Sequence, residues 1–386
     1  IRDKLVTGVQ TCALPIFAVY TNTAQPALIG KAVIVGDFTQ YNGTNRGRIA
    51  RLNADGSLDT QFMRLVGGVT NGSVTCVAIQ PDGRVLVAGS FTNINGVART
   101  NLARLNSDGT LDVTFTIGTG ANAQINALAL QPDGRVLIAG NFTTFSGAAA
   151  PLVARLNTNG TLDATFNVGV GPNSFVQALA LQADGRVVIG GDFTAVNGLV
   201  RNRLARLGTN GAVDATFDAG AGPDSTVNTI ALRPDGKIFV GGEFLNVAGQ
   251  PRSHVAMLTA SGAVDGSFAP ALGADDSVFG LTLQPDGQLL VGGAFLSFEG
   301  VTESRIVRLN PDGSIDFGIT FGAGANNFVN AFALQPWDAK IIAVGGFNQF
   351  DGVNRGGVVR LNGGRSEEHT SELQSLAYLV CRLLLE

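Results

Sequence analysis

Residues 131–142 read Gln-Pro-Asp-Gly-Arg-Val-Leu-Ile-Ala-Gly-Asn-Phe, and the fold can be inferred from this segment. Its Pro132-Asp133-Gly134 segment is typical of a three-residue hairpin turn, because proline fixes φ at the first position and glycine accepts the left-handed conformation at the third. Apolar segments that alternate as strands do stand on both sides of the turn, at 125–131 and 135–139. The stretch therefore predicts a β-hairpin that ends in Gly140-Asn141-Phe142. Glycine close to a bulky aromatic residue there indicates a bulge or a close backbone approach.

The same hairpin ending recurs seven times along the chain, at spacings of 53, 51, 51, 51, 51 and 52 residues. The recurring phenylalanines are Phe38, Phe91, Phe142, Phe193, Phe244, Phe295 and Phe347. A fixed period of this length indicates an array of one supersecondary unit. We expect each phenylalanine to be a core residue between adjacent sheets.

A second hairpin completes each repeat. In the third copy it consists of strand 152–156, the turn Thr158-Asn159-Gly160 and strand 162–166. Four short strands in about 51 residues form one antiparallel sheet whose two faces are both apolar, so neighbouring sheets must cover them. The predicted fold is all-β, a β-propeller of four-stranded antiparallel blades, about seven in number with the last incomplete. In the seventh copy Pro336-Trp337-Asp338-Ala339 replaces the usual turn, and we expect a distorted hairpin there.

The three-residue turn of the second hairpin fixes which residues lie opposite each other. It predicts cross-strand ion pairs in five copies: Arg51 with Asp59, Arg104 with Asp112, Arg155 with Asp163, Arg206 with Asp214, and Arg308 with Asp316. The fifth copy has Met257 opposite Asp265, so the acid persists without its arginine. We therefore expect these aspartates to accept hydrogen bonds from nearby backbone as well.

Two sets of residues carry a resemblance to a known family. They are the Gln-Pro-Asp-Gly-Arg-Val-Leu run at 80–86 with Gly89-Ser90-Phe91, and the segment 103–112 with its Asp108-Gly109 turn. The chain resembles the delta-60 repeat family over residues 28–362. That resemblance implies a bacterial protein with tandem propeller repeats, exported to the cell surface or secreted, without an assigned activity. The later Tyr and Trp of the kelch repeat are absent, and we expect no WD40 signature.

The two ends of the chain share nothing with the repeat. Residues 1–16 and 365–386 resemble translated sequencing-adapter sequence, and a secretory signal in the first 25 residues is the competing interpretation. We therefore expect a metagenomic fragment whose propeller domain covers residues 17–364. The apolar run near the C-terminus is too short and too charged to span a bilayer.

Composition excludes several classes of function. The net charge of −4 comes without a basic stripe, so the chain is a poor candidate for nucleic acid, and no stretch is amphipathic enough for a membrane surface. Between the two ends, Cys76 is the single cysteine and His254 the single histidine, which argues against a disulfide and a zinc cluster. We expect a monomer without cofactor or metal.

Three local patterns could carry chemistry, and each has a simpler interpretation. The alternating oxygen-bearing residues at 53–59 lack the glycine and the distant Glu of an EF-hand calcium loop. Asp275-Asp276 could serve glycoside hydrolysis, although a solvated loop between blades explains the pair. Ser253-His254 has no third member of a triad at a plausible spacing. We expect no catalytic residues.

Arginines recur just beyond the variable loops that follow each phenylalanine: Arg46, Arg99, Arg201, Arg252 and Arg355. We expect them on one rim of the ring, either as a binding surface or paired with neighbouring blades. The favoured function is a noncatalytic surface or secreted scaffold that binds protein or glycan or spaces other domains. A polysaccharide-acting propeller enzyme is the alternative, and it would need acids from different blades on one face.

Overall fold

The computed structural model describes residues 16–21, 24–41, 43–64, 67–335 and 340–362. The two ends that resemble adapter sequence, apart from Ile16, and the unusual turn at 336–339 lie outside the described residues. Around that turn, the Gln335 amide donates to the Lys340 carbonyl, so four residues lie between the paired ones where other copies have three.

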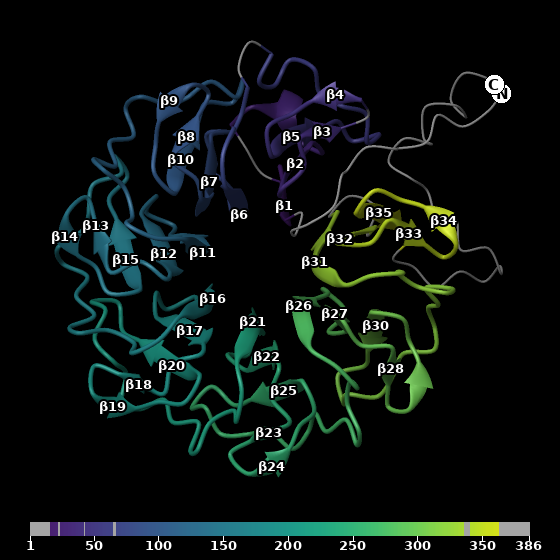
Figure 1. Cartoon of the computed structure of the whole chain (residues 1–386). Coiled ribbons are helices and arrows are strands. Elements are labelled where there is room, and N and C mark those ends of the chain that lie inside the picture. The colour runs from purple at the N-terminus through teal and green to yellow at the C-terminus, as the bar shows by residue number, and fades with distance from the viewer. Residues whose placement is uncertain (1–15, 22–23, 42, 65–66, 336–339, 363–386) are drawn as a thin grey trace.

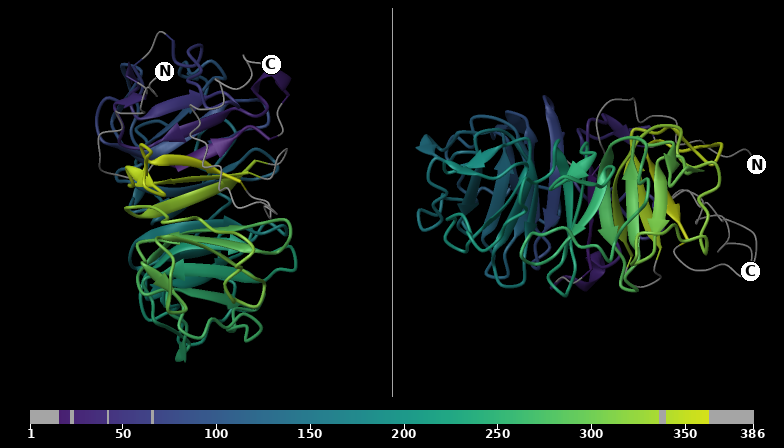
Figure 2. Two further views of the ribbon diagram at one scale, coloured as in Figure 1. Left: turned by 90° about the vertical axis from the view of Figure 1, so that its right-hand side faces the viewer. Right: turned by 90° about the horizontal axis from the view of Figure 1, so that it is seen from below.

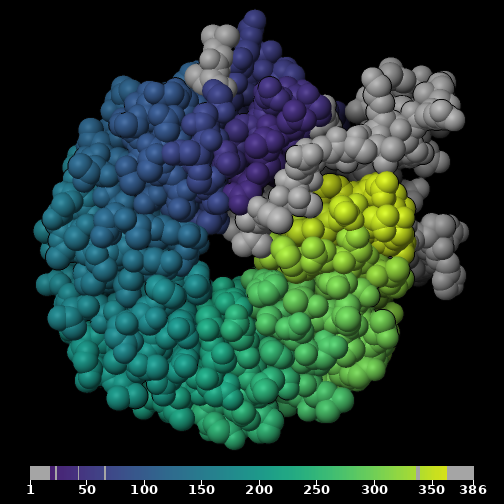
Figure 3. Space-filling model, in the orientation of Figure 1, coloured from purple at the N-terminus to yellow at the C-terminus, as the bar shows by residue number. Residues whose placement is uncertain are grey.

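Seven small sheets stand side by side in a ring (Figure 1). Seen from the side, the blades form a single layer (Figure 2), and the space-filling view shows an opening at the centre (Figure 3). We number the blades 1 to 7 in chain order, so that blade 1 is the sheet β1-β2-β5 and blade 7 is β31-β32-β35. The β-propeller predicted from the repeat is thereby confirmed.

Each blade is an antiparallel sheet of three strands. The innermost strands are β1 (Ile16–Val19), β6 (Ser73–Ile79), β11 (Ile125–Leu130), β16 (Val176–Leu181), β21 (Val227–Leu232), β26 (Val278–Leu283) and β31 (Val329–Leu334). The middle strands are β2 (Ala32–Val35), β7 (Val85–Ser90), β12 (Val136–Gly140), β17 (Val187–Gly191), β22 (Ile238–Gly242), β27 (Leu289–Gly293) and β32 (Ile341–Gly345). The outer strands are β5 (Ile49–Leu52), β10 (Leu102–Leu105), β15 (Val153–Leu156), β20 (Leu204–Leu207), β25 (Val255–Leu258), β30 (Ile306–Leu309) and β35 (Val358–Leu361). A short 3₁₀ helix, η1 (Pro26–Leu28), precedes β2.

A separate two-stranded hairpin lies at the outside of every blade, where the sequence predicts only a variable loop (Figure 1). The hairpins are β3 (Gln40–Tyr41) with β4 (Thr44–Asn45), β8 (Asn93–Ile94) with β9 (Val97–Ala98), β13 (Thr144–Phe145) with β14 (Ala148–Ala149), β18 (Ala195–Val196) with β19 (Leu199–Val200), β23 (Asn246–Val247) with β24 (Gln250–Pro251), β28 (Ser297–Phe298) with β29 (Val301–Thr302), and β33 (Gln349–Phe350) with β34 (Val353–Asn354). In β8-β9 the turn is Asn95-Gly96, and both residues have positive φ, as a type I′ turn requires.

The predicted fourth strand is reduced to a single bridge. Leu162 pairs with Leu156 in the predicted register, but residues 163–166 do not continue the ladder. The carboxylate of Asp163 accepts the amide of Thr165, and the Asp163 carbonyl accepts the amide of Phe166. These local bonds turn the chain away directly after the bridge, so blades 1 to 6 each have three strands, one bridge and a separate hairpin, and the described residues of blade 7 end before the bridge position.

The glycine near the end of each middle strand and the phenylalanine that follows it have different structural roles. Opposite Gly140, strand β11 contains a bulge between Ile125 and Ala127, and a Cβ on Gly140 would overlap the Gln124 carbonyl oxygen. Phe142 is fully buried against Leu86 and Ala88 of the preceding blade. The predictions of a bulge with close backbone approach and of a core phenylalanine between blades are both confirmed.

The same packing closes the ring between its ends. Phe38 and Ile34 of blade 1 form one buried cluster with Ile342 and Val344 of blade 7. In the described part of the chain, no strand of blade 1 is hydrogen-bonded to a strand of blade 7. Side-chain packing therefore joins blades 7 and 1 as it joins every other neighbouring pair.

Candidate functional site

Each sheet has two ends that face opposite sides of the ring. The turns 132–134 and 158–160 lie at one end of blade 3, and we call this side of the ring the turn face. Gly140 and the start of β15 lie at the other end, and we call that side the rim face. The turn residues therefore lie on the turn face, and the recurring arginines that follow the outer hairpins lie toward the rim face.

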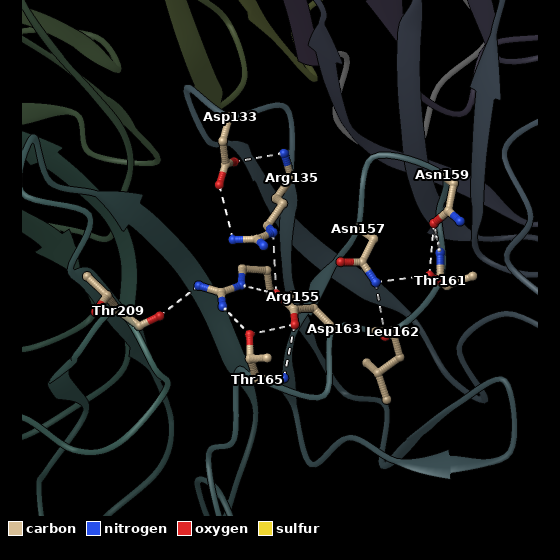
Figure 4. A network of polar contacts seen from close by, with 10 residues as sticks. All are labelled: Asp133, Arg135, Arg155, Asn157, Asn159, Thr161, Leu162, Asp163, Thr165 and Thr209. Atoms are coloured by element: carbon tan, nitrogen blue, oxygen red, sulfur yellow. Dashed lines mark hydrogen bonds and ion pairs between the residues drawn. The ribbon is translucent and has the colours of Figure 1, made fainter.

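On the turn face, Arg155 of blade 3 is the centre of a polar network (Figure 4). Its Nε donates to Asp163 Oδ2 at 2.7 Å, and its Nη1 donates to the Thr209 carbonyl of the next blade at 2.7 Å. Asp163 also accepts the Thr165 amide at 2.9 Å, and the guanidinium lies over the Phe166 ring at 4.9 Å. Both the predicted ion pair and the predicted backbone hydrogen bond to the aspartate are confirmed.

Equivalent networks repeat around the turn face. The predicted ion pairs form at 2.7–2.8 Å in Arg51–Asp59, Arg104–Asp112, Arg155–Asp163, Arg206–Asp214 and Arg308–Asp316. The arginines of the first four pairs also donate to a turn carbonyl of the next blade, at Ser107, Thr158, Thr209 and Ala260. A buried ion pair is stabilising only when further hydrogen bonds satisfy both partners, and these bonds supply that condition. The network therefore connects the blades, and few of its hydrogen-bonding groups remain available to a ligand.

The fifth copy shows how the network tolerates the loss of its arginine. Lys237 approaches from the middle strand, and its Nζ lies 2.8 Å from Asp265 Oδ2. Phe239, opposite Met257 in the sheet, makes an edge-to-face contact with Phe268 at 5.0 Å. An aromatic pair thus replaces the cation–π contact of the other copies, and Lys237 keeps the second ion pair, which Lys31, Arg84, Arg135 and Arg186 make at the equivalent position.

We predict that acid destabilises the ring through these aspartates. Burial would raise the pKa of Asp214, but hydrogen bonds from Thr216 and Arg206 lower it to about 2. Hydrogen bonds from Lys237 and Ser267 lower the pKa of Asp265 to about 2. Because an unfolded aspartate has a pKa of about 3.9, this stabilisation is complete above about pH 4 to 5 and is lost as pH falls toward 2.

The urea midpoint should therefore fall steadily between pH 5 and pH 2. Asp265→Asn removes one titrating group, so its midpoint should start lower at pH 6 and depend less steeply on pH. A midpoint that stays constant from pH 5 to pH 2 would contradict the assignment.

The other polar patterns singled out in the sequence are also engaged by the fold. Ser57 donates through its amide and hydroxyl to Asp55, which accounts for the calcium-like run as turn chemistry. Asp275 accepts the amides of Leu296 and Ser297, so it fastens the linker between blades to an outer hairpin. Asp275 and Asp276 are both exposed in the loop between blades, as expected, and the Asp275 carboxylate also accepts these hydrogen bonds.

Two isolated reactive residues lie in structural positions. His254 is buried, and its Nδ1 lies 3.1 Å from the Gly242 carbonyl oxygen. Cys76 is buried, and burial raises the pKa of its thiol to about 12, so it stays protonated. Among the described residues, no group of three or more His, Cys, Asp and Glu side chains could hold a metal ion. None of the described helices is long and apolar enough to cross a membrane.

The five predicted rim arginines directly follow the second strand of an outer hairpin and are half-buried. Each donates from Nη1 to the carbonyl of the residue before it, as Arg252 does to Pro251 at 2.7 Å. Pairing with acids of neighbouring blades was the competing interpretation. No ion pair to any described residue forms at Arg46, Arg99, Arg201 or Arg252. The equivalent position is Ala150 in blade 3 and Glu303 in blade 6, so the structure distributes these arginines around the rim rather than gathering them.

One of the rim arginines lines a pocket between blades 1 and 2. Its volume is about 550 Å³, and its walls are Thr39, Asn45, Arg46, Gly47, Arg48, Met63, Arg64, Gly67, Val69 and Thr70. Neither Arg48 nor Arg64 belongs to the arginines predicted from the sequence. The sequence did contain one signal for this pocket. The spacing from Phe38 to Phe91 is 53 residues instead of 51, and both extra residues fall in the linker from Phe62 to Val74.

Comparisons with known proteins agree with the ring of repeats. A family described as "Domain of unknown function (DUF5122) beta-propeller" matches residues 30–62, 80–115, 131–166, 182–217, 233–268, 284–316 and 338–363. A second family, "WD domain, G-beta repeat", matches residues 62–94. The expectation that WD40 features are absent is therefore wrong for this one segment.

Among solved structures, the chain is similar to one titled "Crystal structure of WD40 beta propeller domain of Doa1". The identity is 14% and the TM-score is 0.55, over 86% of this chain and 88% of the other. At this identity the likeness concerns the fold. The search among curated proteins gave no match.

Proposed function

The chain belongs to the DUF5122 β-propeller family, and on that premise we propose that it is a noncatalytic scaffold that binds a protein or a glycan on its rim face. We also propose that its repeat unit is the delta-60 repeat, on the strength of the motif at residues 80–91. The resemblance supports placing the protein on a bacterial surface or outside the cell. It supports a monomer that spaces other domains as a further role of the same scaffold.

One observation carries this proposal. The polar residues that recur on the turn face are consumed in connections between blades, whereas Arg46, Arg99, Arg201 and Arg252 have no ion pair with a described residue. Unpaired guanidinium groups with free donors are well suited to carboxylate, sulfate or carbonyl groups of a partner. The rim face is therefore the favoured binding surface.

The acids in the linkers between blades support a catalytic role less well than the arginines support a binding role. Asp224 and Asp275 are exposed; partial desolvation would raise the pKa of each, but hydrogen bonds from the next outer hairpin lower it below the usual value. A general acid in glycoside hydrolysis needs the opposite shift. We therefore propose a binding protein rather than a polysaccharide-acting enzyme.

The test is a binding screen of the full chain on arrays of glycans and matrix proteins. We predict that the triple variant Arg99→Gln, Arg201→Gln, Arg252→Gln loses binding by tenfold or more, because each lost charge-assisted hydrogen bond weakens association. The matched control neutralises three half-exposed arginines on the turn face, Arg84, Arg135 and Arg186.

Equal losses in the two triple variants would contradict a rim site, because they would reflect net charge alone. Failure to bind any glycan or protein would reduce the proposal to the spacer role. Release of reducing sugar from a polysaccharide would contradict the noncatalytic proposal.

A further inference from the structure

The pocket between blades 1 and 2 exists because the linker there differs from the others. The Met63 amide donates to the Asp108 carbonyl, as the Thr116 amide donates to Asn159 in the next blade, so Arg64 occupies the position of Ile117. Ile117 is 2% exposed in the core cluster of its blade. In the equivalent cluster the buried residue is Met63, which is also 2% exposed and has a φ of 57°, and Arg64 after it is exposed. The linker is also two residues longer, and its described residues Arg64, Gly67 and Thr70 line an open pocket.

Three arginines and no acid line this space. The described lining of the pocket contains Arg46, Arg48 and Arg64 but neither Asp nor Glu. Arg48 Nη1 donates to the Val69 carbonyl at 3.0 Å, and Arg46 Nη1 donates to the Asn45 carbonyl at 2.9 Å. These bonds hold the two guanidinium groups in place, and the buried Nε atoms of both have no hydrogen-bond partner in the structure. The pocket therefore holds a fixed, uncompensated positive charge.

We propose that this pocket binds the carboxylate or sulfate group of an acidic saccharide. The guanidinium groups would receive the oxyanion, and Thr39, Asn45 and Thr70 would bond to ring hydroxyls. The volume of about 550 Å³ is within the usual range for a small-molecule site and exceeds what an inorganic anion needs. The inference rests on the proposed binding function and names its ligand class.

Blade 4 supplies a matched control within the same molecule. Arg201-Asn202-Arg203 repeats the spacing of Arg46-Gly47-Arg48. The next linker there has the original length, its Ala219 is 6% exposed, and Asn202 Nδ2 donates to the Ala221 carbonyl at 2.8 Å. The same arginine pair is thus present without the opened space.

Isothermal titration calorimetry of the full chain tests the proposal with a uronic-acid disaccharide, a sulfated disaccharide and a neutral disaccharide. At least one acidic disaccharide should bind and the neutral one should not. Arg64→Gln and Arg48→Gln should each weaken binding by tenfold or more, whereas Arg203→Gln, at the position in blade 4 equivalent to Arg48, should change it by less than twofold. Arg64 is exposed, so its substitution leaves the fold intact. Binding of the uronic-acid disaccharide would indicate carboxylate recognition, and binding of the sulfated disaccharide would indicate sulfate recognition.

Several outcomes would overturn the inference. They are an affinity that Arg64→Gln leaves unchanged, equal binding of the neutral disaccharide, and binding of inorganic sulfate without either acidic disaccharide. Stronger binding of a glutamate-rich peptide would assign the pocket to a protein partner instead. Array binding that survives Arg64→Gln but not the rim triple variant would keep the proposed function and reject the pocket.

Discussion

Phe244→Ala should lower the free energy of unfolding by about 3–5 kcal/mol, the usual cost of removing a fully buried phenylalanine. Phe244 is 0% exposed and belongs to one buried cluster with Val188 and Leu204 of the preceding blade. The substitution removes a ring that fills the space between two sheets, and strands fixed by their ladders cannot collapse into the cavity. Urea unfolding of the full chain measures the loss.

Phe317→Ala is the control for this prediction, because Phe317 is 76% exposed. Its free energy of unfolding should stay within about 0.5 kcal/mol of the parent, as for most surface substitutions. A loss below about 1 kcal/mol for Phe244→Ala would show that the phenylalanine does not hold the two blades together.

Gly242→Ala should cost about 3 kcal/mol, although it adds a single methyl group. A Cβ at this position would overlap the Thr226 carbonyl oxygen and lie 3.0 Å from the Cα of Val227. Both obstacles are backbone atoms at the start of the neighbouring strand β21 and of the residue before it, beside the bulge between Val227 and Thr229, so no side chain can move aside. Overpacking of this kind typically costs 1–3 kcal/mol and occasionally more.

Gly266→Ala in the same blade is the matched control. A Cβ there meets nothing within 4 Å, so this variant should be neutral or slightly more stable, because alanine reduces the entropy of the unfolded chain. Thermal unfolding of both variants gives the comparison. Equal melting temperatures would contradict the close approach at Gly242.

The sequence predicted the parts of the fold that short-range turn chemistry controls. A three-residue turn closed by glycine sets the register of its hairpin, so the opposition of Arg155 and Asp163 could be derived from spacing alone. The same glycine signal predicted the bulge opposite Gly140. In both cases the determinants lie within a few residues of each other.

Longer-range features could not be derived in this way. The outer hairpins have strands of two residues, such as β14 with two alanines, which are too short to show alternation. Only turn pairs such as Asn95-Gly96 indicate these hairpins in the sequence. The pocket depends on which side chain fills a space between two blades, and spacing does not show where Arg46 or Arg64 points.

The packed seam between blades 7 and 1 has an entropic consequence. Phe38 and Ile342 are about six repeat lengths apart in the chain, whereas other neighbouring blades are one repeat apart. Loop-closure entropy grows only with the logarithm of loop length, at about 0.6 kcal/mol per doubling, so bringing these distant ends together costs roughly 1.5 kcal/mol more than joining adjacent blades. A single buried phenylalanine contributes more than that. The circular arrangement therefore requires no shared strand between its first and last blades, because one ordinary interface between blades outweighs the cost of the long loop.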